Sequence, residues 1–417
     1  MTFDRQINPF WSFNVKTRWS ASSEDQRSQT TLSAAPDVEP TTWSLANIEV
    51  AQRQTEFTIN PNLQAKFALG PTQNVWLTGV DYSRVTDSGF MHEDVGVPPV
   101  DLLNDPAFPT PYTDPNPASP TFFPVFDFHS VYVTKGAYTQ LQSTIYDRLH
   151  LLAGVRLASI NIDYLEKFPF GLSVFSPTSF GSDKTKALPR IGAVFDLVPG
   201  LSIYSSYSEG MMATPFTQAL NTNIEPETSQ QLEAGFKLNI NNQLTGTIAA
   251  FDIQRQNVPV QIGVGAESAQ ESKGYEADLI WQPDKNWKVL ASYGHTDVVF
   301  SDSFAGAPAG NHPSGVPADS GRVWVNYAFD TAALRGWSVG AGVYAASSQY
   351  VDNLNLYQTP GYFTVDAKIG YENEHFRASF NVKNLTGEKY FVPFAWLGGQ
   401  VAPGDGRGFY GTLAYKY

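Results

Sequence analysis

The side chains that could carry out chemistry in this chain are scattered rather than grouped. No histidine pair has the spacing that metal ligands need. Ser176, Ser179 and Ser182 lack a Gly-x-Ser-x-Gly turn, and no Gly-rich strand-to-helix turn could hold a phosphate. Glu225 and Glu227 could serve a glycosidase, but turn and strand-entry roles suit them better. We therefore expect neither an enzyme nor a cofactor or metal site. The histidines are His92, His129, His150, His295, His312 and His375.

Aromatic side chains in the long polar segments are the candidates for binding a ligand. Flat apolar rings beside a few hydrogen-bonding groups bind bulky organic ligands, provided that the rings face a cavity. Packing within the loops is the alternative explanation for each of these residues. The candidate ligand-binding residues are Phe122, Phe123, Tyr132, Met211, Phe216, Tyr350, Phe394 and Trp396.

The elements that would position these side chains are two-faced strands. In the last nine residues, Phe409, Gly411, Leu413 and Tyr415 alternate with small and polar residues, and the chain ends on Tyr417. The same period of two recurs along the chain, for example in 232–240, 363–371 and 376–383, and the charged residues share one side of each segment. A dry core would not accept those charges without partners, whereas a water-filled interior would.

Composition points in the same direction. The chain has 417 residues with 28 Phe, 20 Tyr and 9 Trp, only 16% charged residues and a mean hydropathy of −0.24. No run approaches the roughly 18 apolar residues of a membrane-spanning helix, but a barrel strand needs only about 9–11 residues. The net charge of −13 argues against nucleic acid as a partner, and without cysteine there are no disulfides. The sequence predicts an all-β, antiparallel, transmembrane outer-membrane β-barrel.

Turns of two lengths alternate between the expected strands. Short turns on one rim and long loops on the other are typical of outer-membrane barrels. We expect short turns at 70–73, 146–148, 198–200, 241–242, 282–286, 330–336 and 372–375. We expect long loops at about 21–42, 86–133, 161–186, 210–227, 301–320, 350–360 and 392–406.

The strand count predicts about sixteen full strands and a truncated one before Trp11. Single-chain bacterial barrels have an even number of strands, so we expect residues 1–417 to be one barrel domain that begins inside a larger barrel. The first residues, from Met1 to Ile7, also lack the basic start and apolar run of a secretion signal.

Several segments resemble one family, the TonB-dependent siderophore receptors of bacterial outer membranes, and in particular the ferrichrome-receptor-like branch. Their order and spacing are compatible with the last sixteen or seventeen strands of a 22-stranded barrel. The segments are Asn62-Leu-Gln-Ala-Lys-Phe67 with Gly70, Leu77-Thr-Gly-Val-Asp-Tyr82, Gly136-Ala-Tyr-Thr-Gln140, Leu152-Ala-Gly-Val-Arg156, Tyr204-Ser-Ser-Tyr-Ser-Glu-Gly210, Glu225-Pro-Glu-Thr-Ser229 with Glu233 and Gly235, Gly274-Tyr-Glu-Ala-Asp278, and Asn381-Val-Lys-Asn-Leu385 with Tyr390.

The resemblance implies a receptor that takes up ferric siderophores across the bacterial outer membrane. Such a receptor has outer-membrane lipid and lipopolysaccharide around it and is expected to be a monomer. It also implies a plug domain and a TonB-contacting segment, neither of which matches any part of this sequence, so TonB would act only through a part outside it. The final long loop, with Phe394 and Trp396, is the best placed for a pocket because this loop often contributes an aromatic in the family.

Two other classes of function remain open on the sequence alone. A passive, porin-like outer-membrane channel would share the two-faced strands but should conduct ions steadily in a planar bilayer. A soluble β-rich secreted enzyme or adhesin would stay in the aqueous phase without detergent. Membrane fractionation separates the last class from the other two.

Overall fold

The computed structural model describes residues 1–32, 37–105, 107, 110–166, 178–213, 225–261, 266–303, 308–394 and 400–416. No helix among these residues is long and apolar enough to cross a membrane. The strands are β1 (Thr2–Gln6), β2 (Trp11–Thr31), β3 (Thr42–Leu69), β4 (Thr72–Asp101), β5 (Phe122–Ile145), β6 (Leu149–Glu166), β7 (Thr178–Val198), β8 (Leu201–Met212), β9 (Glu227–Ile240), β10 (Leu244–Gln261), β11 (Ala266–Trp281), β12 (Trp287–Phe300), β13 (Asp319–Ala328), β14 (Trp337–Ala346), β15 (Gln349–Tyr350), β16 (Gln358–Thr359), β17 (Tyr362–Glu372), β18 (Phe376–Lys383), β19 (Phe391–Phe394), β20 (Gln400–Pro403) and β21 (Gly408–Tyr415).

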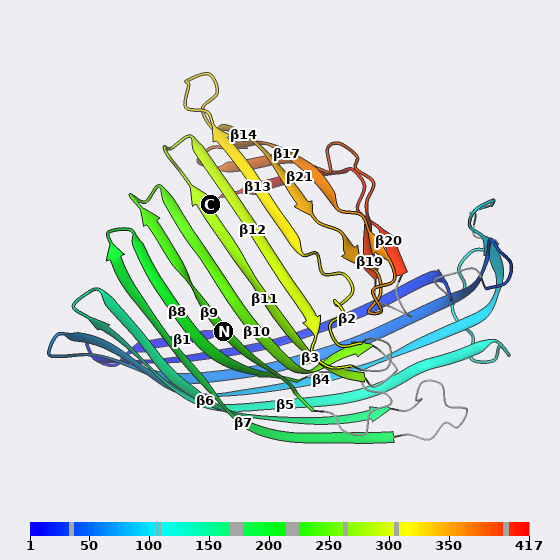
Figure 1. Cartoon of the computed structure of the whole chain (residues 1–417), viewed down its shortest axis with the longest axis horizontal. Coiled ribbons are helices and arrows are strands. Elements are labelled where there is room, and N and C mark those ends of the chain that lie inside the picture. Colours follow the sequence, from blue (N-terminus) through cyan, green and yellow to red (C-terminus); the bar gives the residue numbers. More distant parts are fainter. Residues whose placement is uncertain are drawn as a thin grey trace.

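Seventeen of these strands form one antiparallel sheet that curls round on itself (Figure 1). Each strand pairs with the next, from β1–β2 through β14–β17 to β18–β21. The predicted sixteen full strands and one short strand are confirmed, and so is the all-β fold. Among the described residues no pairing joins β1 to β21. Two short hairpins, β15–β16 and β19–β20, stand apart from the main sheet.

The seven predicted short turns are confirmed, because each lies between two consecutive paired strands. Asn241 and Asn242 have φ angles of 51° and 56°, and Tyr146 and Asp147 have φ angles of 50° and 54°. Such left-handed pairs give a turn the twist that matches two antiparallel strands, and asparagine adopts this conformation more readily than most residues.

The predicted long loops are too long in most cases. Strand β2 continues to Thr31, β4 continues to Asp101 and β5 already begins at Phe122, so much of 21–42 and 86–133 is strand. Residues 161–166 and 178–186 are strand as well. Polar, proline-containing sequence was interpreted as loop, but above a membrane a strand needs no apolar face, and its backbone is satisfied by pairing. Figure 1 shows β2–β7 reaching far beyond the other strands.

The strand register sorts the side chains into an apolar and a polar face. Directly opposed residues lie on the same face. Phe236 is opposite Ile203 and Ile248, and Phe380 is opposite Ile369, whereas Lys237 is opposite Ser202 and Thr247. On the apolar face large side chains are widely exposed, with Leu413 at 76% and Leu232 at 55%. Such an apolar surface is stable only when something other than water covers it.

Aromatic pairs line the apolar face beside the short turns. The ring centroids of Trp11 and Trp76 are 6.1 Å apart, and those of Trp287 and Tyr327 are 4.8 Å apart. The pairs Trp337 with Tyr371 and Phe376 with Tyr415 continue the row, both at 5.2 Å. This row is the aromatic girdle expected at a membrane–water interface.

Further from the short turns, the apolar face changes to charged residues at a level that we call the upper boundary. It is marked by Arg84, Lys135, Asp252 and Lys273. The apolar stretch between the girdle and this boundary corresponds to the roughly 9–11 residues of a tilted transmembrane strand. Strand segments beyond the boundary therefore lie outside the membrane, on the long-loop side.

Candidate functional site

A buried apolar cluster lies on the polar-face side of β3–β6, beyond the upper boundary. We call it the inner cluster. Phe128, Ile160 and Ile162 are each only 1% exposed. Register places these residues on the face opposite the girdle, because Tyr132 is opposite Ile162 and Met91 is opposite Phe126. The inner cluster consists of Ala46, Ile48, Met91, Val125, Phe126, Phe128, Tyr132, Ile160, Ile162 and Tyr164.

The aromatic rings of the inner cluster are held by the sheet itself. Phe128 stacks on Tyr164 with centroids 5.8 Å apart and an interplanar angle of 11°, and Phe126 meets Phe128 edge-on at 6.0 Å. Phe128 also lies over Gly89, where an added Cβ would come within 3.2 Å of its ring. Because these rings are almost fully buried, they form the base on which partly buried apolar residues such as Met211 pack, and an apolar layer of this kind suits a bulky ligand with apolar faces.

Polar groups are embedded beside these rings. Asp87 is 1% exposed, and Gln52 Nε2 donates to its two carboxylate oxygens at 3.0 and 2.9 Å. Burial raises the pKa of the Asp87 carboxyl above its usual range. The hydroxyl of Tyr132, a residue only 5% exposed, has no hydrogen-bond partner among the described residues. A buried unpaired hydroxyl is costly and is often satisfied by a bound molecule.

The polar face below the inner cluster is braced by side chains that cross whole strands. Arg156 on β6 reaches over Gly136 on β5 to Asp81 on β4, with Nη2 to Oδ1 at 2.6 Å. Tyr138 lies over Gly79 in the same way and donates to Asn60 at 2.8 Å. These contacts keep long side chains flat against the wall instead of projecting from it.

The family of this protein follows from a match that covers most of the chain. Residues 1–385 match the sequence profile of the family described as TonB dependent receptor-like, beta-barrel. The chain belongs to the TonB-dependent receptor family. Its barrel lies in the bacterial outer membrane and crosses it many times, so the apolar face with its girdle faces lipid and the polar face lines the lumen. The family is one of receptors, which agrees with the expectation of a non-enzymatic protein.

Several curated relatives of this TonB-dependent receptor are named for the compounds that they recognise. The chain is 22% identical over 353 residues to the ferrioxamine B receptor of Salmonella typhimurium, covering 81% of this chain and 47% of the relative. It is 23% identical to the ferric-pyoverdine 358 receptor of Pseudomonas putida, covering 99% and 51%. The chain thus spans about half the length of these relatives.

Solved structures of receptors share the fold. The ferric-catecholate import receptor Fiu of E. coli K12 superposes with a TM-score of 0.80 at 20% identity, covering 99% of this chain and 62% of that one. The siderophore receptor PiuA of Acinetobacter baumannii gives a TM-score of 0.78 at 19% identity, covering 100% and 63%. At these identities the likeness concerns the fold alone.

The predicted ligand residues fall into two described groups. Tyr132 belongs to the inner cluster, and Met211 packs against it. Phe122, at the start of β5, lies 5.1 Å from the ring of His92, and Phe123 is 39% exposed. Tyr132, Phe122 and Phe123 were expected in a loop, which is wrong because all three lie in β5.

The remaining predicted residues lie on the short strands β15 and β19 or outside the residues that the structure describes. Tyr350 on β15 stacks on His312 with centroids 5.5 Å apart. Phe394 ends β19, and its backbone pairs with Gln400, but its side chain is not among those described. Phe216 and Trp396 lie outside the described residues.

Sequence reasoning missed much of the inner cluster. Ile160, Ile162 and Tyr164 alternate along β6, a period of two that overlaps the polar stretch interpreted as loop. Met91 on β4 was missed for the same reason, whereas Ile48 on β3 lies outside the predicted loops and was not singled out. Asp87 carried no signal in the sequence, because only burial distinguishes it from other loop carboxylates. Among the described residues no group of three metal-binding side chains comes together.

Proposed function

We propose that this chain forms the major part of the barrel of a receptor that takes up ferric siderophores across the outer membrane. The observation that carries the proposal is the apolar layer on the lumen face at the long-loop end, where the partly buried Met211 packs on the aromatic inner cluster. The names of the curated relatives support ferric siderophores as the ligand class.

A ferric siderophore suits this surface on chemical grounds. Its iron is already enclosed by oxygen ligands, so the protein needs to supply aromatic faces and hydrogen bonds rather than metal ligands. Tyr132 and Met211 would contact the ligand from the inner cluster, with Phe123 and Tyr350 as further contacts. Phe122 is the least favoured of the candidates, because it shares the outer face of the sheet with Phe90 and His92. Phe216, Phe394 and Trp396 remain candidates from the adjoining loops.

Transport in this proposal depends on the TonB complex, which would act through a plug and a TonB-contacting segment expected outside the matched barrel. The receptor would need no cofactor of its own and would act as a monomer. This dependence separates the proposed receptor from a passive channel, which conducts without energy input.

The proposal is tested in outer membranes of cells that lack their own siderophore receptors. The chain is expressed with whatever sequence adjoins it in its native gene, and binding of ⁵⁵Fe-loaded ferrioxamine B, ferrichrome and a catecholate siderophore is measured. We expect saturable binding of at least one of them, and uptake only in cells with TonB. Absence of binding to every compound, together with steady ion conductance in planar bilayers, would overturn the proposal in favour of a porin-like channel.

A further inference from the structure

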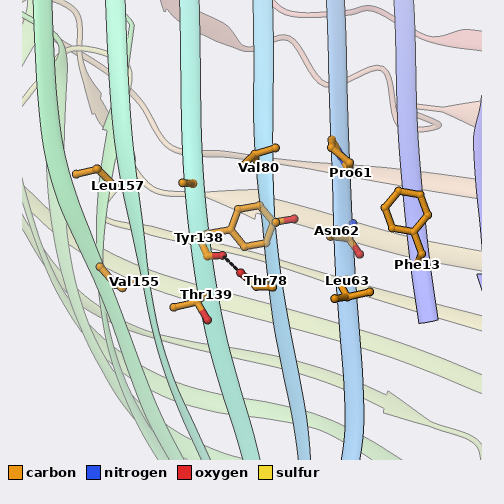
Figure 2. A pocket seen from close by; sticks show the side chains of 12 residues that line it. Phe13, Pro61, Asn62, Leu63, Thr78, Val80, Tyr138, Thr139, Val155 and Leu157 are labelled. Carbon is orange, nitrogen blue, oxygen red and sulfur yellow. Dashed lines mark hydrogen bonds between the residues drawn. The ribbon is translucent and has the colours of Figure 1, made fainter. Parts of the chain in front are cut away.

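Charged side chains are divided unevenly between the two faces of β2–β6. At membrane depth the lipid face is apolar. Figure 2 shows the side chains that line a hollow in it, with Phe13 at one end and Val155 and Leu157 at the other, and this lining contains no charged residue. Beyond the upper boundary, the described parts of the same strands carry carboxylates on the lumen face but no lysine or arginine there. The lumen beside the inner cluster is therefore acidic.

The strand register identifies the acidic residues of this region. The carboxylates with described side chains on the lumen face above the upper boundary are Glu24, Glu56, Asp87 and Glu93. The basic residues of the same segments, Arg27 and Arg53, lie on the outer face. On the neighbouring strand β7, Lys184 and Lys186 each form an ion pair with a glutamate. A ligand that approaches the inner cluster along β2–β6 meets negative charge, which attracts a cation and repels an anion.

Glu93 differs from the other carboxylates because it has no partner. Glu56 Oε2 lies 3.9 Å from Nη1 of Arg18, and Asp87 accepts hydrogen bonds from Gln52. Glu93 is half-buried and forms no hydrogen bond or ion pair with any described residue. Burial raises the pKa of its carboxyl. A carboxylate that is partly removed from water without a counter-charge is unfavourable, and a bound cation would offset this cost.

The position of Glu93 places it beside the apolar layer. It lies at the outer end of the inner cluster, opposite Ile48 on β3 and opposite Phe123 on β5. Directly opposed side chains have Cβ atoms about 4.5–5.5 Å apart. Unlike the buried rings of the inner cluster, Phe123 is 39% exposed and can be reached from the lumen. A carboxylate next to an exposed aromatic ring suits an ammonium group, which forms an ion pair with the first and a cation–π contact with the second.

We propose that the ligand of this receptor is a positively charged siderophore complex whose ammonium group binds between Glu93 and Phe123. The inference rests on the proposed function and deepens it by naming the ligand class, a ferric hydroxamate with a free amine. Hydroxamate groups neutralise the ferric ion, so a protonated amine leaves the complex positively charged, whereas a catecholate complex is anionic. The apolar part of the ligand would lie on the layer around Met211, and its ammonium group would supply the counter-charge that Glu93 lacks.

The test compares two ligands that differ only in this charge. The chain is expressed in outer membranes with the sequence that adjoins it in its native gene. Binding of ⁵⁵Fe-loaded ferrioxamine B, which has a free amine, is measured beside the same compound with the amine acetylated. We expect the free amine to bind about tenfold more tightly, as for one partly exposed ion pair and one cation–π contact. Equal binding of the two compounds, or a preference for a catecholate complex, would overturn the inference and leave the receptor function standing. Binding of no siderophore at all would overturn both.

Variants locate the ammonium group. In Glu93→Gln we expect affinity for ferrioxamine B to fall about fivefold while affinity for the acetylated compound stays unchanged, which also shows that the variant is folded. Phe123→Leu should reduce the remaining preference in the same selective way. The matched control is Asp163→Asn, an exposed carboxylate on the outer face of β6, which should alter neither affinity. If Glu93→Gln weakens both compounds equally, Glu93 supports the fold and does not bind the ammonium group.

Discussion

Arg156 and Asp81 form a two-point ion pair across an intervening strand. Nη2 of Arg156 lies 2.6 Å from Oδ1 of Asp81, and Nε lies 3.1 Å from Oδ2. Strand β5 separates the two, and the guanidinium passes over it at Gly136, where an added Cβ would come within 2.6 Å of Arg156. This ion pair therefore links β6 to β4 across β5, and it depends on glycine, which has no side chain, at position 136.

Replacing Gly136 should break this contact. In Gly136→Ala we expect a loss of about 1–2 kcal/mol in the free energy of unfolding, because the pair is charge-assisted and only partly exposed. Urea unfolding of the membrane-inserted chain measures the loss. Gly294→Ala is the control, since nothing lies within 4 Å of a Cβ added there. Equal losses in the two variants would show that the pair contributes nothing.

Trp324 depends on glycine in a similar way. Its indole lies over Gly340 and Gly342 on the neighbouring strand, where added Cβ atoms would come within 2.8 and 2.5 Å of the ring. Gly342→Ala should push the indole into the lumen and make its fluorescence more accessible to acrylamide. The difference between each protein and its Trp324→Phe counterpart isolates this signal from the other tryptophans. An unchanged quenching constant would show that Gly342 is not required for the Trp324 indole to lie against the lumen wall.

Asp87 should make stability depend on pH. Because burial raises its pKa in the folded protein, the fold favours the protonated carboxyl, and stability falls as pH rises from the ordinary value of about 3.9 through the raised value. At pH values above the raised pKa, the folded protein bears the full free-energy cost of a charged, buried Asp87 carboxylate. Asp87→Asn should therefore be more stable than the natural chain at pH 7 and should lack this acid-range slope. Unfolding midpoints between pH 3.5 and 7.5 test this, with Asp183→Asn as the exposed control. Parallel curves for Asp87→Asn and the natural chain would contradict it.

The ligand residues give a prediction within the proposed function. Tyr132→Phe keeps the ring but removes the unpaired hydroxyl, so we expect affinity for the bound siderophore to fall about fivefold, as for the loss of one hydrogen bond. Met211→Ala should weaken binding by a similar factor. Phe380→Ala, on the lipid face, is the control. Binding of the labelled siderophore to outer membranes is measured, and an unchanged Tyr132→Phe would remove this residue from the site.

The sequence predicted the membrane part of the fold well, because two physical signals coincide there. Alternation such as that around Phe236 and Lys237 shows which face each residue takes, and the Asn241–Asn242 turn fixes the register of its hairpin. Outside the membrane the first signal weakens, since the outer face of a strand meets water and only local burial, as at Ile160 and Ile162, keeps the other face apolar. For that reason Tyr132 was assigned to a loop although it lies in β5, and Ile160 and Tyr164 were missed.

The central claim, that one face of the sheet meets lipid and the other lines a wet lumen, is open to direct measurement because the chain has no cysteine. Single cysteines are introduced as Phe236→Cys, Lys237→Cys, Thr412→Cys and Leu413→Cys, and the proteins are labelled in outer membranes. We expect a water-soluble maleimide to label positions 237 and 412, and brominated lipid to quench a fluorophore at 236 and 413. The reverse pattern, or equal labelling of both faces, would contradict the account.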